Sequence, residues 1–125
     1  NNIYQALADY RNLKIKYSSA AEIGAAALSA DDALSKETMA MFFAVLGAAA
    51  GNFALTLGAK GGIYIAGGIV PRYLDLLRRS DFRARFLAKG RFADYLSDIP
   101  TFVVTHSQLG LLGASASLND PHIRG

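Results

Sequence analysis

Cysteine is absent from the 125-residue sequence, so the chain can form neither a disulfide framework nor a thiolate metal site. The absence fits a reducing cytosol, and we expect a cytoplasmic protein. A large charge excess is also lacking. The 13 Lys and Arg against 10 Asp and Glu give a net charge of +3, too small to indicate nucleic acid as a partner. The residues present, 52% apolar and 18% charged, are typical of a globular protein of about one domain.

The basic residues gather in one segment, residues 72–91. It holds only two acidic residues, Asp75 and Asp81, against seven basic ones: Arg72, Arg78, Arg79, Arg83, Arg85, Lys89 and Arg91. Solvated helix faces are the favoured interpretation. The alternative, in which some of these residues face an anion or a partner, stays open.

One uncharged run, residues 38–59, is long enough to cross a bilayer and contains the pair Gly47 and Gly51 at GxxxG spacing. The run is rich in Ala and Gly, and its flanks lack the pattern of an interfacial anchor. We therefore expect a mostly buried helix, packed on several sides within a soluble core. A membrane anchor is the minor alternative.

Helical spacing of apolar residues predicts a helix over residues 2–13. The pair Ser19 and Glu22 forms a capping box, which predicts a second helix through residue 28. Asp31 or Asp32 begins the long helix, which should end near residue 57 because Gly58 follows.

The segments 63–66, "IYIA", and 101–105, "TFVVT", are predicted strands. Further helices should begin near Pro71 and at Ser80 or Asp81, and the later ones should cover residues 92–96 and 109–118. Helices outnumber strands and two strand–helix units appear, so the layout is α/β, helix-rich with few strands. Two strands make a poor independent sheet, and this organisation predicts part of a larger domain.

The glycine pair Gly67 and Gly68 lies between the first strand and the helix near Pro71. Ligands of open α/β sheets bind beyond the carboxyl ends of strands, and glycine lets a backbone approach a ligand closely. A following helix N-terminus would suit phosphate. A tight turn without a ligand is the simpler interpretation of the pair alone.

Catalytic motifs are missing. Neither GxxxxGK[ST] nor a GxGxxG after a strand occurs, and no pair of carboxylates stands out as acid and base. His106 and His122 have no second ligand at a metal spacing, so no metal site is predicted. We expect His106 to be a hydrogen-bonded structural residue.

Residues 58–118 contain "GGIYIAGGIVPR", then "KGRF", and finally "GLLG". This order closely resembles the C-terminal part of the bacterial ATP-dependent glucokinase family, and the resemblance extends upstream to "NNIYQALADYRN". It implies part of a ribonuclease H-like, actin-like ATPase domain. It also implies that Gly67 and Gly68 contact the nucleotide near adenosine and the α-phosphate, and that helix 37–57 lies at the hinge between two domains.

The resemblance further implies an intact enzyme that transfers the γ-phosphoryl group of ATP, with Mg²⁺, to the 6-hydroxyl of glucose. In the family, the phosphate loop, the catalytic aspartate and the glucose-contacting residues lie upstream of this segment. No catalytic residue is therefore assigned to this chain, and we expect the isolated chain to be inactive.

Residues 1–118 would form the C-terminal portion of the large domain, incomplete on its N-terminal side, and residues 119–125 a mobile tail. A homo-oligomer, in particular a dimer, is expected from the family and from apolar surface left uncovered. The alternative is a non-catalytic kinase-like module for dimerisation in a sugar-responsive transcriptional regulator.

Overall fold

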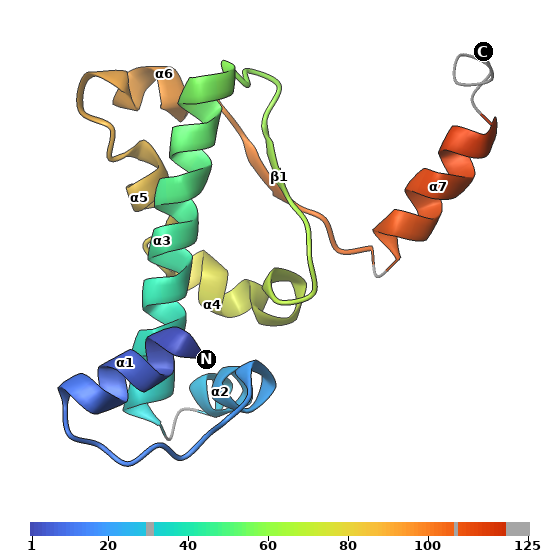
Figure 1. The fold of residues 1–125 in the computed structure, drawn as a ribbon. Helices are drawn as coiled ribbons and strands as arrows, with labels where there is room; N and C mark the ends of the chain where they lie inside the picture. The colour runs from blue at the N-terminus through green and yellow to red at the C-terminus, as the bar shows by residue number, and fades with distance from the viewer. Residues whose placement is uncertain (30–31, 107, 120–125) are drawn as a thin grey trace.

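The long helix α3 (Ala33–Leu57) lies at the centre of the fold, and most of the other helices pack against it. The computed structural model describes residues 1–29, 32–106 and 108–119. Helices α1 (Asn2–Tyr10) and α2 (Ala20–Leu28) pack near the start of α3, as Figure 1 shows. The helices α4 (Leu74–Arg79), α5 (Phe82–Leu87) and α6 (Ala93–Ser97) follow along its length.

Local capping signals set the helix ends, as predicted. The Glu22 amide donates to the Ser19 hydroxyl at 3.2 Å, while the Ser19 amide donates to the Glu22 carboxylate at 3.0 Å. Backbone N–H groups of Ser18 and Ser19 lower the pKa of Glu22. Gly58 ends α3 in the left-handed conformation, with φ of 60°. Helix α1 is shorter than predicted and ends at Tyr10.

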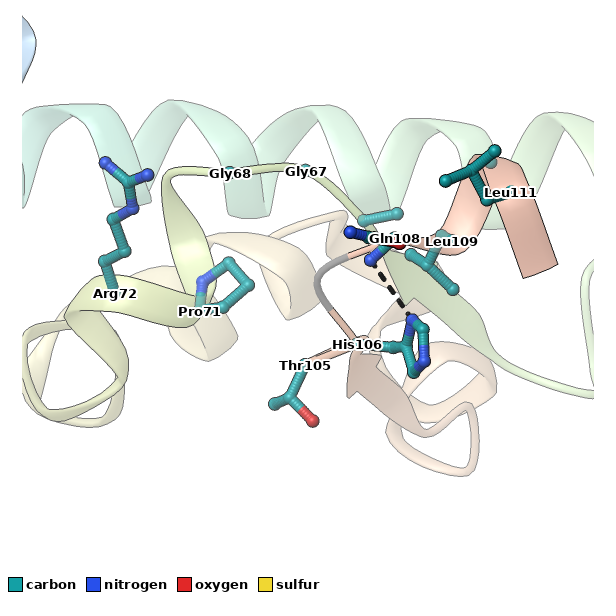
Figure 2. Close-up of a pocket in the computed structure, with 11 residues that line it drawn as sticks. Gly67, Gly68, Pro71, Arg72, Thr105, His106, Gln108, Leu109 and Leu111 are labelled. Carbon is teal, nitrogen blue, oxygen red and sulfur yellow. Dashed lines mark hydrogen bonds between the residues drawn. The ribbon is translucent and has the colours of Figure 1, made fainter. Parts of the chain in front are cut away.

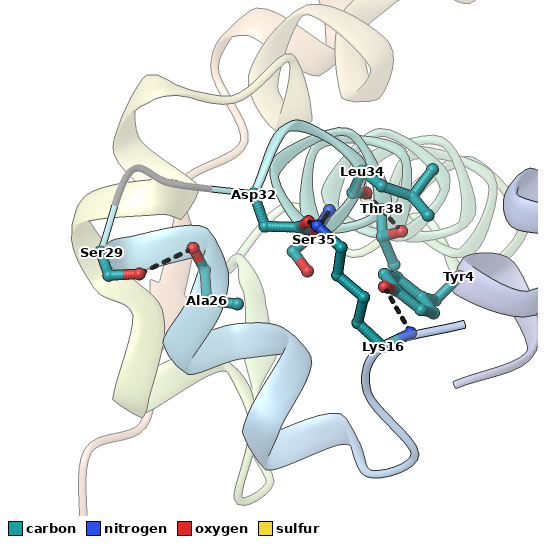
Figure 3. A network of polar contacts seen from close by, with 8 residues as sticks. All are labelled: Tyr4, Lys16, Ala26, Ser29, Asp32, Leu34, Ser35 and Thr38. Atoms are coloured by element: carbon teal, nitrogen blue, oxygen red, sulfur yellow. Dashed lines mark hydrogen bonds and ion pairs between the residues drawn. The ribbon is translucent and has the colours of Figure 1, made fainter. Parts of the chain in front are cut away.

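Asp32 is the N-cap of α3, and the alternative cap Asp31 lies outside the described residues. The Asp32 carboxylate accepts from the Ser35 amide at 2.8 Å and lies 3.4 Å from the Lys16 ammonium (Figure 3). The Ser35 side chain first, and then the Ser35 amide and Lys16, hold the pKa of Asp32 below its ordinary value. This cap connects the segment before α2 with the start of α3.

The GxxxG pair of α3 is used inside the fold. A Cβ on Gly47 would overlap the carbonyl oxygen of Phe82, and one on Gly51 would overlap that of Phe86. Phe82 and Phe86 belong to α5, and their side chains are buried with Phe43 in the main core. The two helices can approach this closely because the glycines have no side chain.

Helix α3 is less buried than predicted. By length and composition it is also apolar enough to cross a membrane. Fewer than half of its 25 residues are buried, and Val45, Phe53 and Leu57 are 59%, 62% and 72% exposed. The expectation of a mostly buried helix was wrong because the described helices cover only part of its circumference. The close packing at Gly47 nevertheless favours a core helix.

The two predicted strands form a parallel pair, each shorter than expected. Strand β1 (Ile63–Ile65) lies beside β2 (Thr101–Val103), with Ile63 opposite Thr101. On one face Ile65 enters the core, and on the other Tyr64 stacks on Phe102 at 4.9 Å between ring centroids.

Gly62, directly before β1, fits closely against the neighbouring strand. Gly62 has φ of +121°, and a Cβ there would lie 2.9 Å from the Phe102 ring. The packing and backbone conformation of the sheet therefore explain the glycine at position 62.

Helix α7 (Leu109–Asn119) extends away from the other helices (Figure 1). Residues 111–118 are all exposed. The final helix is confirmed, whereas the predicted mobile tail lies, from residue 120 on, outside the described residues.

Candidate functional site

A cavity of about 840 Å³ opens at the carboxyl ends of the two strands. Residues 66–68 and 71–72, which follow β1, form one wall. Residues 105–106 and 108–111, which follow β2 and begin α7, form the other (Figure 2). This position is the one at which parallel α/β sheets bind ligands.

The backbone conformation requires glycine at only one of the two positions of the turn. Gly67 has φ of +133°, a conformation that residues with a side chain rarely adopt. Gly68 has no such φ, and apart from its chain neighbours no described atom lies within 4 Å of the position its Cβ would take. Neither the backbone nor the packing of the described chain therefore requires glycine at position 68, which lines the cavity.

The chain enters the next helix through a 3-10 turn, η1 (Val70–Tyr73). Pro71 lies in its first turn, as predicted. The expected α-helix does not begin there, since α4 starts at Leu74 and has six residues. A short 3-10 turn has a weak aligned dipole, so the geometry gives little support to a helix N-terminus as the phosphate binder.

The facing wall contains groups that were not predicted as site residues. The Gln108 amide donates to Nδ1 of His106 at 3.1 Å, which agrees with a hydrogen-bonded structural histidine (Figure 2). His106 is exposed at the cavity and not in the core. The parallel order of the strands could have indicated it, because their carboxyl ends meet at one edge. His122 lies outside the described residues.

The arginines of the basic segment 72–91 have different roles. Arg83 donates to the carbonyl oxygens of Ser97 at 2.8 Å and Ile99 at 2.9 Å, which is a structural role. Arg78 lies 3.4 Å from the Asp75 carboxylate on the surface. Arg72 lines the cavity.

The described part of the chain shows no set of metal ligands. Within residues 1–29, 32–106 and 108–119, no group of three or more His, Asp or Glu is placed to hold a metal ion. No carboxylate, the protein group through which Mg²⁺ is usually held, is among the described residues that line the cavity.

Comparison with known proteins gives consistent results. The family model described as Glucokinase matches residues 1–121. The chain is 41% identical to the glucokinase of Hahella chejuensis over 122 residues, covering 98% of this chain and 38% of that protein. It is 46% identical to the glucokinase of Colwellia psychrerythraea, covering 94% of this chain and 37% of that protein.

A solved structure agrees in fold. The crystal structure of glucokinase from an Antarctic psychrotroph superposes with a TM-score of 0.82 and 37% identity, over 94% of this chain and 36% of that one. The chain thus spans a little over a third of the length of these relatives, and none of them supports the alternative of a transcriptional regulator. The resemblance seen in the sequence is confirmed: this chain belongs to the glucokinase family.

Proposed function

We propose that the chain is part of an ATP-dependent glucokinase. The intact protein would transfer the γ-phosphoryl group of ATP to the 6-hydroxyl of glucose in the cytoplasm. The family match and the fold support this proposal. Residues 1–118 would form the C-terminal portion of the large domain of an actin-like ATPase fold, with α3 at the hinge side.

Within that enzyme, the turn at Gly67 and Gly68 forms the adenosine side of the nucleotide cleft. The observation that carries this role is the glycine at position 68, which lines the cavity although the described chain does not need it. A bare backbone lets a flat base or a ribose pack directly on the peptide planes. The cavity lies where a nucleotide is expected in such a sheet.

The chemistry of phosphoryl transfer depends on positioning and on stabilising charge, with Mg²⁺ between phosphate oxygens. The described residues can bind and orient the nucleotide on one side. They offer no ligand set for Mg²⁺, so no step is assigned to the metal through this chain. We therefore propose that the isolated chain lacks glucokinase activity, and metal-dependent formation of glucose 6-phosphate by the purified chain would contradict this.

The binding role is tested with Gly68→Ala and the matched control Gly61→Ala. Neither glycine has a positive φ, and beyond the chain neighbours no described atom lies within 4 Å of either Cβ position, so both variants should fold normally. Gly61 does not line the cavity. In calorimetric titrations with Mg-ADP, Gly68→Ala should weaken binding about tenfold or more, because the added methyl lies where the ligand packs.

Gly61→Ala should bind as the parent chain does. Equal affinity of Gly68→Ala and the parent chain would contradict the proposed contact.

A further inference from the structure

The cavity contains a single permanent charge among its described lining residues, the guanidinium of Arg72. The remaining described groups are glycines, apolar side chains, a hydroxyl, an amide and the imidazole of His106. A ligand that carries negative charge would therefore find one fixed cation on the wall that also holds Gly68.

The Arg72 side chain makes no hydrogen bond or ion pair with the described part of the chain, and it is exposed. The nearest acidic residue in sequence, Asp75, is already 3.4 Å from the Arg78 guanidinium. By contrast, Arg83 in the same basic segment is engaged by backbone carbonyls. Arg72 is thus a cation whose five donors remain open to a ligand.

The backbone of Arg72 is held in place, although its guanidinium is exposed. Its amide donates to the Ile69 carbonyl at 3.1 Å. On either side, Val70 and Tyr73 are only 5% and 8% exposed, and the Tyr73 ring packs against Gly24 of α2. In Figure 2 the side chain extends away from η1 on the side of the Gly67–Gly68 turn. A fixed backbone reduces the entropy lost when the guanidinium orders on a ligand.

We propose that Arg72 binds phosphate oxygens of the nucleotide whose adenosine packs on Gly67 and Gly68. This inference rests on the proposed function. The planar guanidinium presents paired N–H donors that match two phosphate oxygens, so it binds phosphate more specifically than an ammonium does. The contribution of Arg72 should therefore depend on the phosphates and not on the base.

The test compares adenosine, AMP and ADP as probes, by calorimetry, for the parent chain and for Arg72→Gln, Arg72→Lys and Arg79→Gln. Arg79 is the control because it is exposed, lies nearby in α4 and does not line the cavity. Arg72→Gln should lose about tenfold in affinity for AMP or ADP and leave adenosine binding unchanged. Arg72→Lys should lose less, and Arg79→Gln should match the parent chain.

Two results would overturn the inference while leaving the proposed function standing. One is ADP affinity of Arg72→Gln equal to that of the parent chain. The other is an equal loss for adenosine and ADP, since the effect would then not involve phosphate. Failure of the parent chain to bind any of the three probes at millimolar concentration would overturn the inference together with the binding role of the turn.

Discussion

Gly47 in the middle of α3 lies directly against the carbonyl oxygen of Phe82 in α5, with no room between them for a side chain. The same arrangement recurs one turn later, where Gly51 lies against the carbonyl oxygen of Phe86. A GxxxG pair that would suit association of two membrane helices is here occupied by a helix of the same chain. The contact fixes α5, and with it the route of the chain from the glycine turn to β2.

Replacement of Gly47 by Ala should destabilise the fold. The methyl group would overlap backbone atoms, which cannot move aside as a side chain can, so we expect a loss of about 1–3 kcal/mol in the free energy of unfolding. Urea denaturation monitored by circular dichroism measures it. Gly113→Ala in α7 is the control, since no described atom beyond its neighbours lies within 4 Å of its Cβ position, and it should leave the stability unchanged or raise it by up to about 1 kcal/mol. Equal midpoints for both variants would contradict the packing described here.

Arg83 should stabilise the connection between α6 and β2. Its guanidinium donates to the carbonyls of Ser97 and Ile99 and lies over the Phe86 ring at 4.7 Å. Arg83→Ala should lower the free energy of unfolding by about 1–3 kcal/mol, because the two carbonyls, that of Ile99 part-buried, lose a charged donor. Arg85→Ala, an exposed neighbour in α5, should change it by less than about 0.5 kcal/mol. Thermal unfolding of the two variants separates the outcomes, and similar midpoints would argue against this role.

Asp32 should make stability depend on acid pH. Because its pKa is lowered in the folded state from the ordinary 3.8, its contribution is present above pH 3.8 and disappears as the pH falls through the folded pKa. Asp32→Asn retains a capping oxygen but not the charge, so it should be less stable at pH 7, by about 1 kcal/mol. The difference in urea midpoint between parent and variant should narrow below pH 3.8. A difference independent of pH would show that the charge contributes nothing.

The chain should self-associate through its uncovered apolar surface. Phe53 on α3 and Tyr64 on β1 are 62% and 67% exposed, and exposed apolar patches promote association. Sedimentation velocity should show a mass that rises with concentration, and Phe53→Ser should shift the distribution toward monomer. Tyr10→Ser is the control, because Tyr10 is 85% exposed on α1, which packs near the start of α3, whereas Phe53 lies near its end. A parent chain that stays monomeric at high micromolar concentration would contradict this prediction.

Features that depend on a few neighbouring residues were predictable from the sequence. The capping box at Ser19, the cap at Asp32 and the left-handed Gly58 each involve contacts within about one helical turn, so their residue types identify them. The two strands were predictable because short β-branched and aromatic runs are bounded by glycine or proline.

Features that depend on contacts between distant residues were not predictable from the sequence. The fit of Gly62 to Phe102 and the bonds from Arg83 to residues 97–99 join parts of the chain whose proximity no local pattern encodes. Likewise, the shared cavity of Gly68 and His106 follows only once β1 and β2 are known to pair in parallel. The exposed side of α3 could not be predicted either, because composition does not say which side of a helix is covered by other elements.

The most direct test of the account is an amide NMR titration of the chain with Mg-ADP, following the signals of Gly67 and Gly68. We predict saturable shifts centred on these two residues and on the facing segment at Gln108. The absence of any shift at millimolar nucleotide would contradict the claim that this glycine turn is a nucleotide-binding surface in the chain itself.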